Sequence, residues 1–120
     1  MNIQIQSLNL ELTDAIADFV YSKFSKTERL VNEADALCNV DLERTTHSQK
    51  QGEVYKVSVR IKTSKDLFQA ETVDEDLYAA IDITKDTIER VVVNESGKRR
   101  SIFKKAAMRF KRLMRRNYEK

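Results

Sequence analysis

The C-terminal segment of residues 98–120 has the densest group of side chains that could bind a charged partner. It holds 11 Lys and Arg residues against one acidic residue, whereas residues 1–97 hold 11 against 18. The net charges are therefore +10 and −7, which sum to the +3 of the whole chain. Basic segments usually meet nucleic-acid phosphates or anionic membrane surfaces, and nucleic acid is the commoner partner in the cytosol. The candidate contacts here are Lys98, Arg99, Arg100, Lys104, Lys105, Arg109, Lys111, Arg112, Arg115 and Arg116.

The same segment is amphipathic when it is drawn as an α-helix, with apolar and basic residues on separate faces at 100° per residue. Ser101 could cap this helix, but Lys104 and Lys105 in its opening turns oppose the helix dipole. We therefore expect a basic amphipathic C-terminal helix that orders on a partner. Besides RNA, that partner could be a membrane surface, a groove in an acidic protein or the acidic body of the same chain. The apolar face consists of Ile102, Phe103, Ala106, Ala107, Phe110, Leu113, Met114 and Tyr118.

Other kinds of chemistry have little support in the composition. One cysteine, Cys38, and one histidine, His47, cannot provide a zinc ligand set. Two glycines leave no room for a glycine-rich phosphate loop, and no Ser/His/Asp or Cys/His pair stands at a recognisable spacing. The acidic residues 74–76 fit the first turn of a helix better than a cation site. The sequence therefore predicts a protein that is not an enzyme, has no cofactor or metal and takes no small-molecule substrate.

Length and hydropathy predict one folded domain. The chain has 120 residues, of which 41% are hydrophobic and 34% are charged, which is too apolar for a wholly disordered chain. No run approaches the roughly 18 consecutive apolar residues of a membrane span, and the first ten residues alternate instead of forming a signal peptide. We therefore expect a cytoplasmic protein.

The hydrophobic periodicity predicts the elements that must position these residues. Alternation predicts strands at residues 2–7, 36–44, 55–62 and 67–73, and the outer face of the third strand is basic. Helical spacing predicts a helix over 13–31 that opens at Thr13, and another from the acidic residues 74–76 to Gly97. The fold class is therefore α+β with the order βαβββα: a four-stranded sheet with two helices on one face and a polar opposite face.

Each predicted helix has an apolar stripe with cations at its border. In the first helix the stripe extends to Leu30 and Val31, and Lys23 and Lys26 lie on one border. In the second helix Lys85 lies on the border. Such lysines could be solvated side chains whose stems pack on the core. The acidic residues expected at more exposed positions are Asp82, Asp86 and Glu89.

One motif and three supporting features connect residues 2–95 to a known family. The motif is Asp76-Leu77-Tyr78-Ala79-Ala80-Ile81-Asp82, at the start of the last predicted helix. The supporting features are the helix opening at Thr13, the Lys23-Phe24-x-Lys26 pattern, and the loop with His47 and Gly52. Together they resemble the ribosome hibernation factor family. The resemblance implies binding to the small ribosomal subunit between head and platform, occlusion of the sites for tRNA and mRNA, and preservation of idle ribosomes.

The resemblance also implies which residues of the body face ribosomal RNA. Lys23, Lys26 and Arg90 match basic positions of the family, and Lys85 is a further candidate. Thr87 stands where many members have a lysine, and the body is acidic, so we expect weaker phosphate contacts there. We predict a division into a hibernation-factor-like domain at 1–97 and a basic extension at 98–120. The protein is expected to be monomeric off the ribosome and not to pair ribosomes through a separate C-terminal domain.

Overall fold

The computed structural model describes residues 1–45 and 53–95. Its elements in chain order are β1 (Asn2–Leu8), α1 (Asp14–Ser25), α2 (Glu28–Val31), β2 (Leu37–Thr45), β3 (Val54–Lys62) and β4 (Leu67–Asp74). A long helix follows over residues 77–95, and we refer to it as the 77–95 helix. The predicted α+β order βαβββα is confirmed. The predicted stop at Gly97 and the predicted basic helix of residues 98–120 lie outside the described residues.

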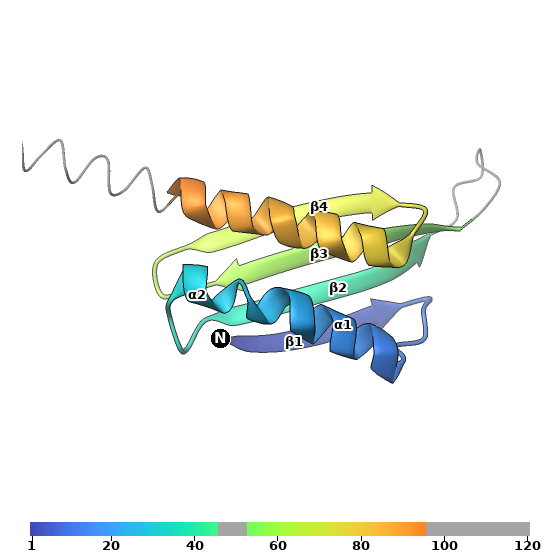
Figure 1. Cartoon of the computed structure of the whole chain (residues 1–120), viewed down its shortest axis with the longest axis horizontal. Helices are drawn as coiled ribbons and strands as arrows, with labels where there is room; N and C mark the ends of the chain where they lie inside the picture. The colour runs from blue at the N-terminus through green and yellow to red at the C-terminus, as the bar shows by residue number, and fades with distance from the viewer. Residues whose placement is uncertain (46–52, 96–120) are drawn as a thin grey trace, which may run out of the picture.

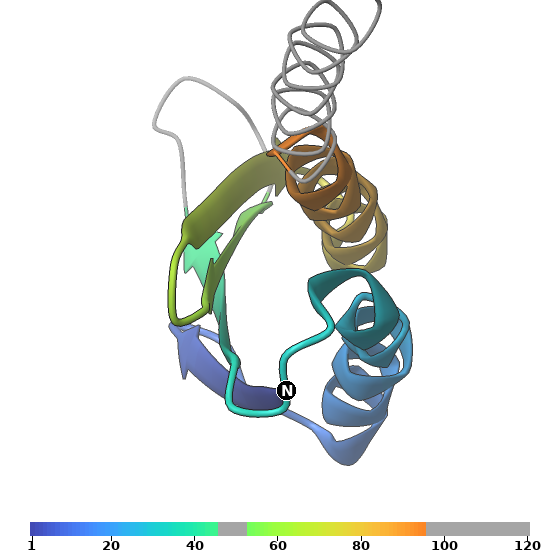
Figure 2. The ribbon, with the colours of Figure 1, turned by 90° about the vertical axis from the view of Figure 1, so that its left-hand side faces the viewer.

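The four strands form one sheet in the order β1-β2-β3-β4. β1 runs parallel to β2, and β2, β3 and β4 form antiparallel pairs. Because parallel neighbours need a crossover connection, α1 and α2 lie between β1 and β2 in the chain. These helices and the 77–95 helix cover the same face of the sheet, and the opposite face is open (Figure 1, Figure 2). The prediction of two helical segments on one face is therefore correct.

The core lies between the sheet and the helices. Alternate residues of β2 and β3 point into it because successive side chains of a strand face opposite sides. Cys38 is fully buried in this core, and burial raises the pKa of its thiol to about 12. The thiol is therefore a small apolar group at neutral pH and offers no reactive thiolate. The buried residues of the core are Ile16, Val20, Phe24, Cys38, Val40, Leu42, Val57, Val59, Ile61, Phe68, Leu77, Ala80, Ile81, Ile88 and Val92.

Side-chain caps fix where both main helices begin. The hydroxyl of Thr13 accepts a hydrogen bond of 3.2 Å from the backbone N–H of Ile16, which confirms the predicted helix opening. The carboxylate of Asp76 accepts from the N–H groups of Tyr78, at 3.0 Å, and Ala79, at 3.5 Å. Asp74 in turn accepts from the N–H of Asp76 at 2.8 Å. These aspartates therefore satisfy donors that the first turn would leave unpaired.

The helix predicted over residues 13–31 is not continuous. The N–H of Thr27 bonds to the carbonyl of Phe24, three residues back, and the carbonyl of Thr27 then accepts from Leu30 and Val31. This tight turn separates α1 from α2 and interrupts the 3.6-residue repeat. Leu30, which the repeat places in the core, is consequently 41% exposed. The prediction was wrong for Leu30 because it continued a single 3.6-residue repeat across the tight turn at Thr27.

Candidate nucleic-acid interface

The two main helices lie side by side and run in the same direction (Figure 1, Figure 2). Three contacts follow one another along their seam. The rings of Phe19 and Tyr78 meet edge to face with centroids 4.9 Å apart. Further along, Lys23 meets Asp82. The buried Thr27 then donates a hydrogen bond of 3.4 Å to Glu89. Because the seam joins α1 to the 77–95 helix in this register, the border cations of both helices lie on one surface.

Lys23 lies on this surface, but its charge is already compensated by a carboxylate. Its ammonium nitrogen is 2.9 Å from a carboxylate oxygen of Asp82, and the side chain is 27% exposed. The same nitrogen is 5.4 Å from the ring centre of Phe19, within the range of a cation–π contact. Lys23 is therefore held across the seam by a carboxylate and an aromatic ring.

Lys85 is held in the same way by carboxylates of its own helix. Its ammonium nitrogen is 3.2 Å from Glu89 and 3.5 Å from Asp86, and its side chain is 16% exposed. The hydrogen bond to Glu89 raises the pKa of Lys85, so it remains protonated at neutral pH. Glu89 was expected to be exposed, but contacts with Lys85 and Thr27 leave its side chain 23% exposed. We call Lys23 and Lys85 the held lysines.

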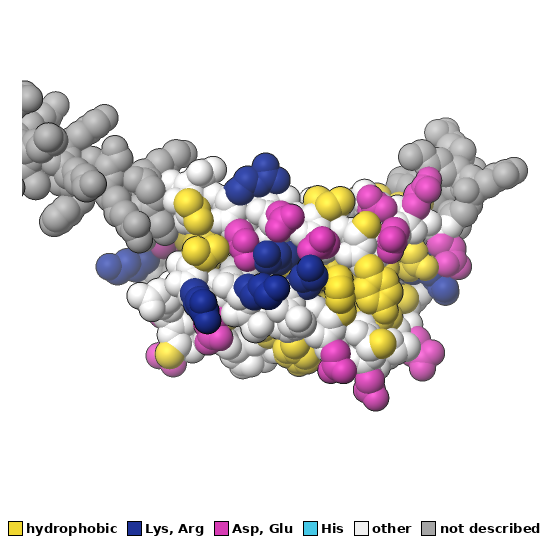
Figure 3. All heavy atoms as spheres, viewed as in Figure 1, with side chains coloured by type: hydrophobic (Ala, Val, Ile, Leu, Met, Phe, Trp, Pro, Cys, Tyr) yellow, Lys and Arg dark blue, Asp and Glu magenta, His cyan; other side chains and the backbone are white. Residues whose placement is uncertain are grey.

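Lys26 and Arg90 behave differently from the held lysines. Both are exposed, and neither forms an ion pair within residues 1–45 and 53–95. Arg29, in the last turn of α2, is exposed and equally unpaired within that part of the chain. Lys and Arg side chains gather over the region between α1–α2 and the 77–95 helix (Figure 3). We call Lys26, Arg29 and Arg90 the helix-face cations.

Arg29 was not among the residues selected from the sequence. A signal was present, because Lys23, Lys26 and Arg29 follow one another at intervals of three. In an α-helix that spacing drifts around the axis, whereas in a turn of three residues it keeps side chains aligned. The tight turn at Thr27 lies between Lys26 and Arg29. The sequence could therefore have identified Arg29 as a contact residue only if it had also revealed the helix break at Thr27.

The opposite end of the same surface is acidic. Asp14 and Asp18 lie in the first turns of α1, and Glu75 and Asp76 lie where the 77–95 helix begins. Asp and Glu side chains collect at this end, near an exposed hydrophobic area (Figure 3). Carboxylates repel phosphate, so this end does not suit RNA. The surface therefore has one end that is suited to RNA and one that is not.

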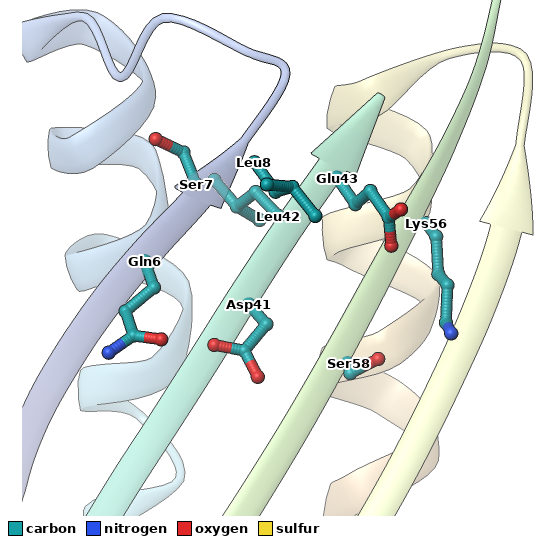
Figure 4. Close-up of a pocket in the computed structure, with 8 residues that line it drawn as sticks. All are labelled: Gln6, Ser7, Leu8, Asp41, Leu42, Glu43, Lys56 and Ser58. Carbon is teal, nitrogen blue, oxygen red and sulfur yellow. The ribbon is translucent and has the colours of Figure 1, made fainter. Parts of the chain in front are cut away.

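The open face of the sheet has a hollow between β1, β2 and β3 (Figure 4). Asp41 and Glu43 line it together with Lys56. Lys56 lies 3.6 Å from Glu71, so its charge is compensated. In the described part of the chain, no group of three or more His, Cys, Asp and Glu residues could hold a metal ion. This hollow offers neither a phosphate site nor a metal site.

Of the predicted contact residues, Lys23, Lys26, Lys85 and Arg90 come together on the helix surface, and those of residues 98–120 lie outside the described residues. Within the described residues, no helix combines the length and the apolar character of a membrane span.

The sequence is similar to curated proteins that act on ribosomes. The ribosome hibernation promoting factor of Azotobacter vinelandii is 31% identical over 98 residues, which cover 82% of this chain and 85% of that protein. The ribosome hibernation promotion factor of Staphylococcus aureus (strain COL) is 31% identical over 93 residues, or 77% of this chain. Those residues cover 46% of the staphylococcal protein, so this chain spans less than half of its length.

Two solved structures share the fold, and a family profile matches most of the chain. The N-terminal domain of Thermus thermophilus Protein Y has a TM-score of 0.63 at 32% identity, and the match covers 77% of this chain and 96% of that domain. A ribosomal subunit interface protein from Coxiella burnetii has a TM-score of 0.68 at 13% identity, covering 81% and 99%, and supports the fold alone. The profile described as "Sigma 54 modulation protein / S30EA ribosomal protein" matches residues 3–100. The chain therefore belongs to the Sigma 54 modulation protein / S30EA ribosomal protein family.

Proposed function

We propose that this chain is a ribosome hibernation factor that acts in the cytoplasm by binding ribosomal RNA of the small subunit. It would occupy the region used by tRNA and mRNA, and so keep idle ribosomes intact and inactive. The observation that carries the proposal is the surface on which Lys26, Arg29 and Arg90 meet without ion-pair partners in the described part of the chain. The names of the relatives support the same conclusion, because two of them are hibernation factors.

The chemistry of this surface suits the phosphate backbone of RNA. Arginine can bind a phosphate with two parallel hydrogen bonds, and lysine binds it as a point charge. Such contacts fix the position of a protein on RNA without reading its sequence. In the part of the chain that the structure describes, the hollow beside Arg90 is lined by no aromatic residue, so stacking on unpaired bases is not expected there. We therefore expect recognition by the shape and spacing of phosphates on folded ribosomal RNA.

The held lysines would have a secondary role. An exposed ion pair contributes only ~0.2–1 kcal/mol, so a nearby phosphate could draw Lys23 away from Asp82 at little cost. Lys85 is less exposed and has two carboxylate partners, so replacing these partners by a phosphate would cost more free energy. The helix-face cations therefore provide the first contacts, and Lys23 is the next cation available.

Cosedimentation with purified small subunits tests the proposal. The triple substitution Lys26→Gln, Arg29→Gln and Arg90→Gln should lower the affinity about a hundredfold at 0.15 M salt, since each phosphate contact contributes about 0.7–0.9 to the log–log salt slope. The slope itself should fall by about 2. The same variant should inhibit a reconstituted translation reaction less than the unmodified protein does.

A control variant removes cations that are already paired on the sheet. Arg44 lies 3.4 Å from Glu53, and Lys56 lies 3.6 Å from Glu71. The double substitution Arg44→Gln and Lys56→Gln should change the affinity less than twofold, because exposed ion pairs contribute little. The proposed function is wrong if the unmodified protein neither sediments with small subunits at moderate salt nor slows translation. The assignment of the surface is wrong if the triple variant binds like the control.

A further inference from the structure

The open face of the sheet is not uniform in charge. Across its strands, residues stand in rows because neighbouring strands pair residue to residue, with directly opposed side chains about 4.5–5.5 Å apart at Cβ. In one row Arg60 stands between Asn39 of β2 and Gln69 of β4. In the next row Lys62 stands between Leu37 and Leu67. Neither of these rows contains a carboxylate.

The remaining rows of the same face are acidic. Ser58 stands between Asp41 and Glu71, and Lys56 stands opposite Glu43. Lys56 is paired with Glu71 at 3.6 Å, so the one cation of these rows is compensated. The open face is thus divided into a cationic half near the turn between β3 and β4 and an acidic half at the other end of the strands.

The cationic half is concave and continues into the turn between β3 and β4. Asn39, Arg60, Lys62 and Lys65 line this hollow, together with the carboxylate of Asp66. Arg60, Lys62 and Lys65 are exposed, and none of them forms an ion pair within residues 1–45 and 53–95. We call these three residues the sheet-face cations. Three cations against one carboxylate leave the hollow with a positive charge.

The turn that carries Lys65 is fixed to the helix side of the molecule. The carboxylate of Glu33 accepts hydrogen bonds from the backbone N–H of Ser64, at 2.9 Å, and from its hydroxyl, at 2.5 Å. These bonds lower the pKa of Glu33, so the contact is present at neutral pH. They join the segment after α2 to the turn between β3 and β4, and the two lie at the same end of the molecule (Figure 1). The helix-face and sheet-face cations therefore flank one end of the domain on opposite sides.

We propose that the sheet-face cations form a second docking surface for the phosphate backbone of RNA, so that this end of the domain is held between two RNA segments. Arg60 would bind phosphate between two side-chain amides, which can also bond to phosphate oxygens or ribose hydroxyls. The two rows present no aromatic side chain for stacking on a base, so contact with the backbone is favoured. The proposal rests on the proposed function, because it assigns a second contact to the same ribosomal RNA.

The test uses the full chain and the double substitution Arg60→Gln and Lys62→Gln. Its small-subunit affinity should fall about tenfold at 0.15 M salt, and the salt slope should fall by about 1.5, since two phosphate contacts are lost. The matched control is the double substitution Arg44→Gln and Lys56→Gln, which removes two paired cations from the same sheet and should have little effect. A variant that keeps the charge, Arg60→Lys with Lys62→Arg, should retain most of the affinity if the contacts are ionic.

The outcomes separate this proposal from the proposed function. If the unmodified protein does not bind small subunits, the proposed function fails and this inference fails with it. If the Lys26, Arg29 and Arg90 variant loses affinity while the Arg60 and Lys62 variant binds like the control, the second surface alone is refuted. A loss of affinity with an unchanged salt slope would also refute it, because the face would then contact protein through Leu37 and Leu67. A thermal melt of each variant excludes unfolding as the cause, and a variant that unfolds is replaced by the single changes.

Discussion

The two ends of the domain carry opposite charges. The helix caps and helix dipoles explain the charges of the acidic end more completely than those of the cationic end. At the acidic end Asp76 caps the 77–95 helix, and Asp14 lies in the first turn of α1, where carboxylates complement the helix dipole. At the cationic end Lys26 and Arg29 lie near the C-termini of α1 and α2, where the dipole favours cations. Arg90 lies inside its helix and gains nothing comparable.

The difference between the ends shows which charges folding explains and which it does not. Side-chain hydrogen bonds to the backbone account for Asp74 and Asp76. Arg90 and the sheet-face cations have no such bonds and no ion pairs in the described part of the chain. Unpaired cations at one end repel each other, which costs stability. We therefore propose that an anionic partner accounts for their presence, and three experiments test that interpretation.

The largest effect is expected from truncation after Gly97. Among the residues that the structure describes, the buried core extends from Ile16 to Val92 and is complete before Gly97, so we expect the shortened protein to fold. The truncation removes 11 Lys and Arg residues. We predict a loss of small-subunit affinity of several orders of magnitude and a fall of several units in the salt slope, since counterion release scales with the phosphates that are neutralised. Cosedimentation over a salt series measures both.

Liposomes of anionic lipid provide the control for this truncation. If residues 98–120 served a membrane, the truncated protein would lose liposome binding and keep its ribosome affinity. If neither the affinity for small subunits nor its salt dependence changed, the segment would not be an RNA element. The helix-face and sheet-face cations would then have to supply the whole interaction.

A smaller effect is expected from the substitution Asp76→Ala at the acidic end. Loss of an N-cap carboxylate should lower the free energy of unfolding by about 1 kcal/mol, within the ~0.5–2 kcal/mol found for such caps. The affinity for small subunits should not fall, because in the proposed function the acidic end does not contact RNA. Urea denaturation and cosedimentation measure the two quantities. Arg90→Gln is the converse control, which should leave the free energy of unfolding unchanged and lower the affinity for small subunits. If Asp76→Ala lowered the affinity and Arg90→Gln lowered the free energy of unfolding, the proposed contrast between the two ends would be wrong.

The sequence alone predicted those parts of the fold that follow from local periodicity. Alternation identified Cys38, Val40 and Leu42 as inward-facing, and all three are buried. The break at Thr27 escaped detection because the hydrophobic spacing continues through it, while the hydrogen bonds that interrupt the helix involve the backbone. Arg29 was missed for the same reason.

The candidate site was predictable only in part. The sequence shows which cations border a helix, and the pair of Lys85 and Glu89, four residues apart, is visible in it. The pairing of Lys23 with Asp82 depends on how two helices align across the core, which no local pattern specifies. Likewise the basic outer face of β3 was evident, but its division into a free and a compensated half required the strand register.

The smallest effect concerns the middle of the helix surface, where Asp82 holds Lys23. If the carboxylate competes with phosphate for this lysine, Asp82→Asn should raise the affinity for small subunits about two- to fivefold, since an exposed ion pair is worth ~0.2–1 kcal/mol. The salt slope should steepen by about 0.7–0.9, the contribution of one added phosphate contact. Asp18→Asn is the matched control, because it removes the same charge from an exposed position at the acidic end of the helix surface.

A double-mutant cycle with Lys23→Gln separates competition from simple repulsion. Coupling between two changes appears only when the residues interact, so the gain from Asp82→Asn should disappear once Lys23 is absent. If Asp82→Asn raised the affinity equally with and without Lys23, Asp82 would only repel the phosphates and would not compete with them for Lys23. A loss of affinity on Asp82→Asn would mean instead that the carboxylate positions the lysine for RNA. In the expected case, Asp82 tunes the middle of the surface so that the unpaired cations of one end make the first contact with RNA.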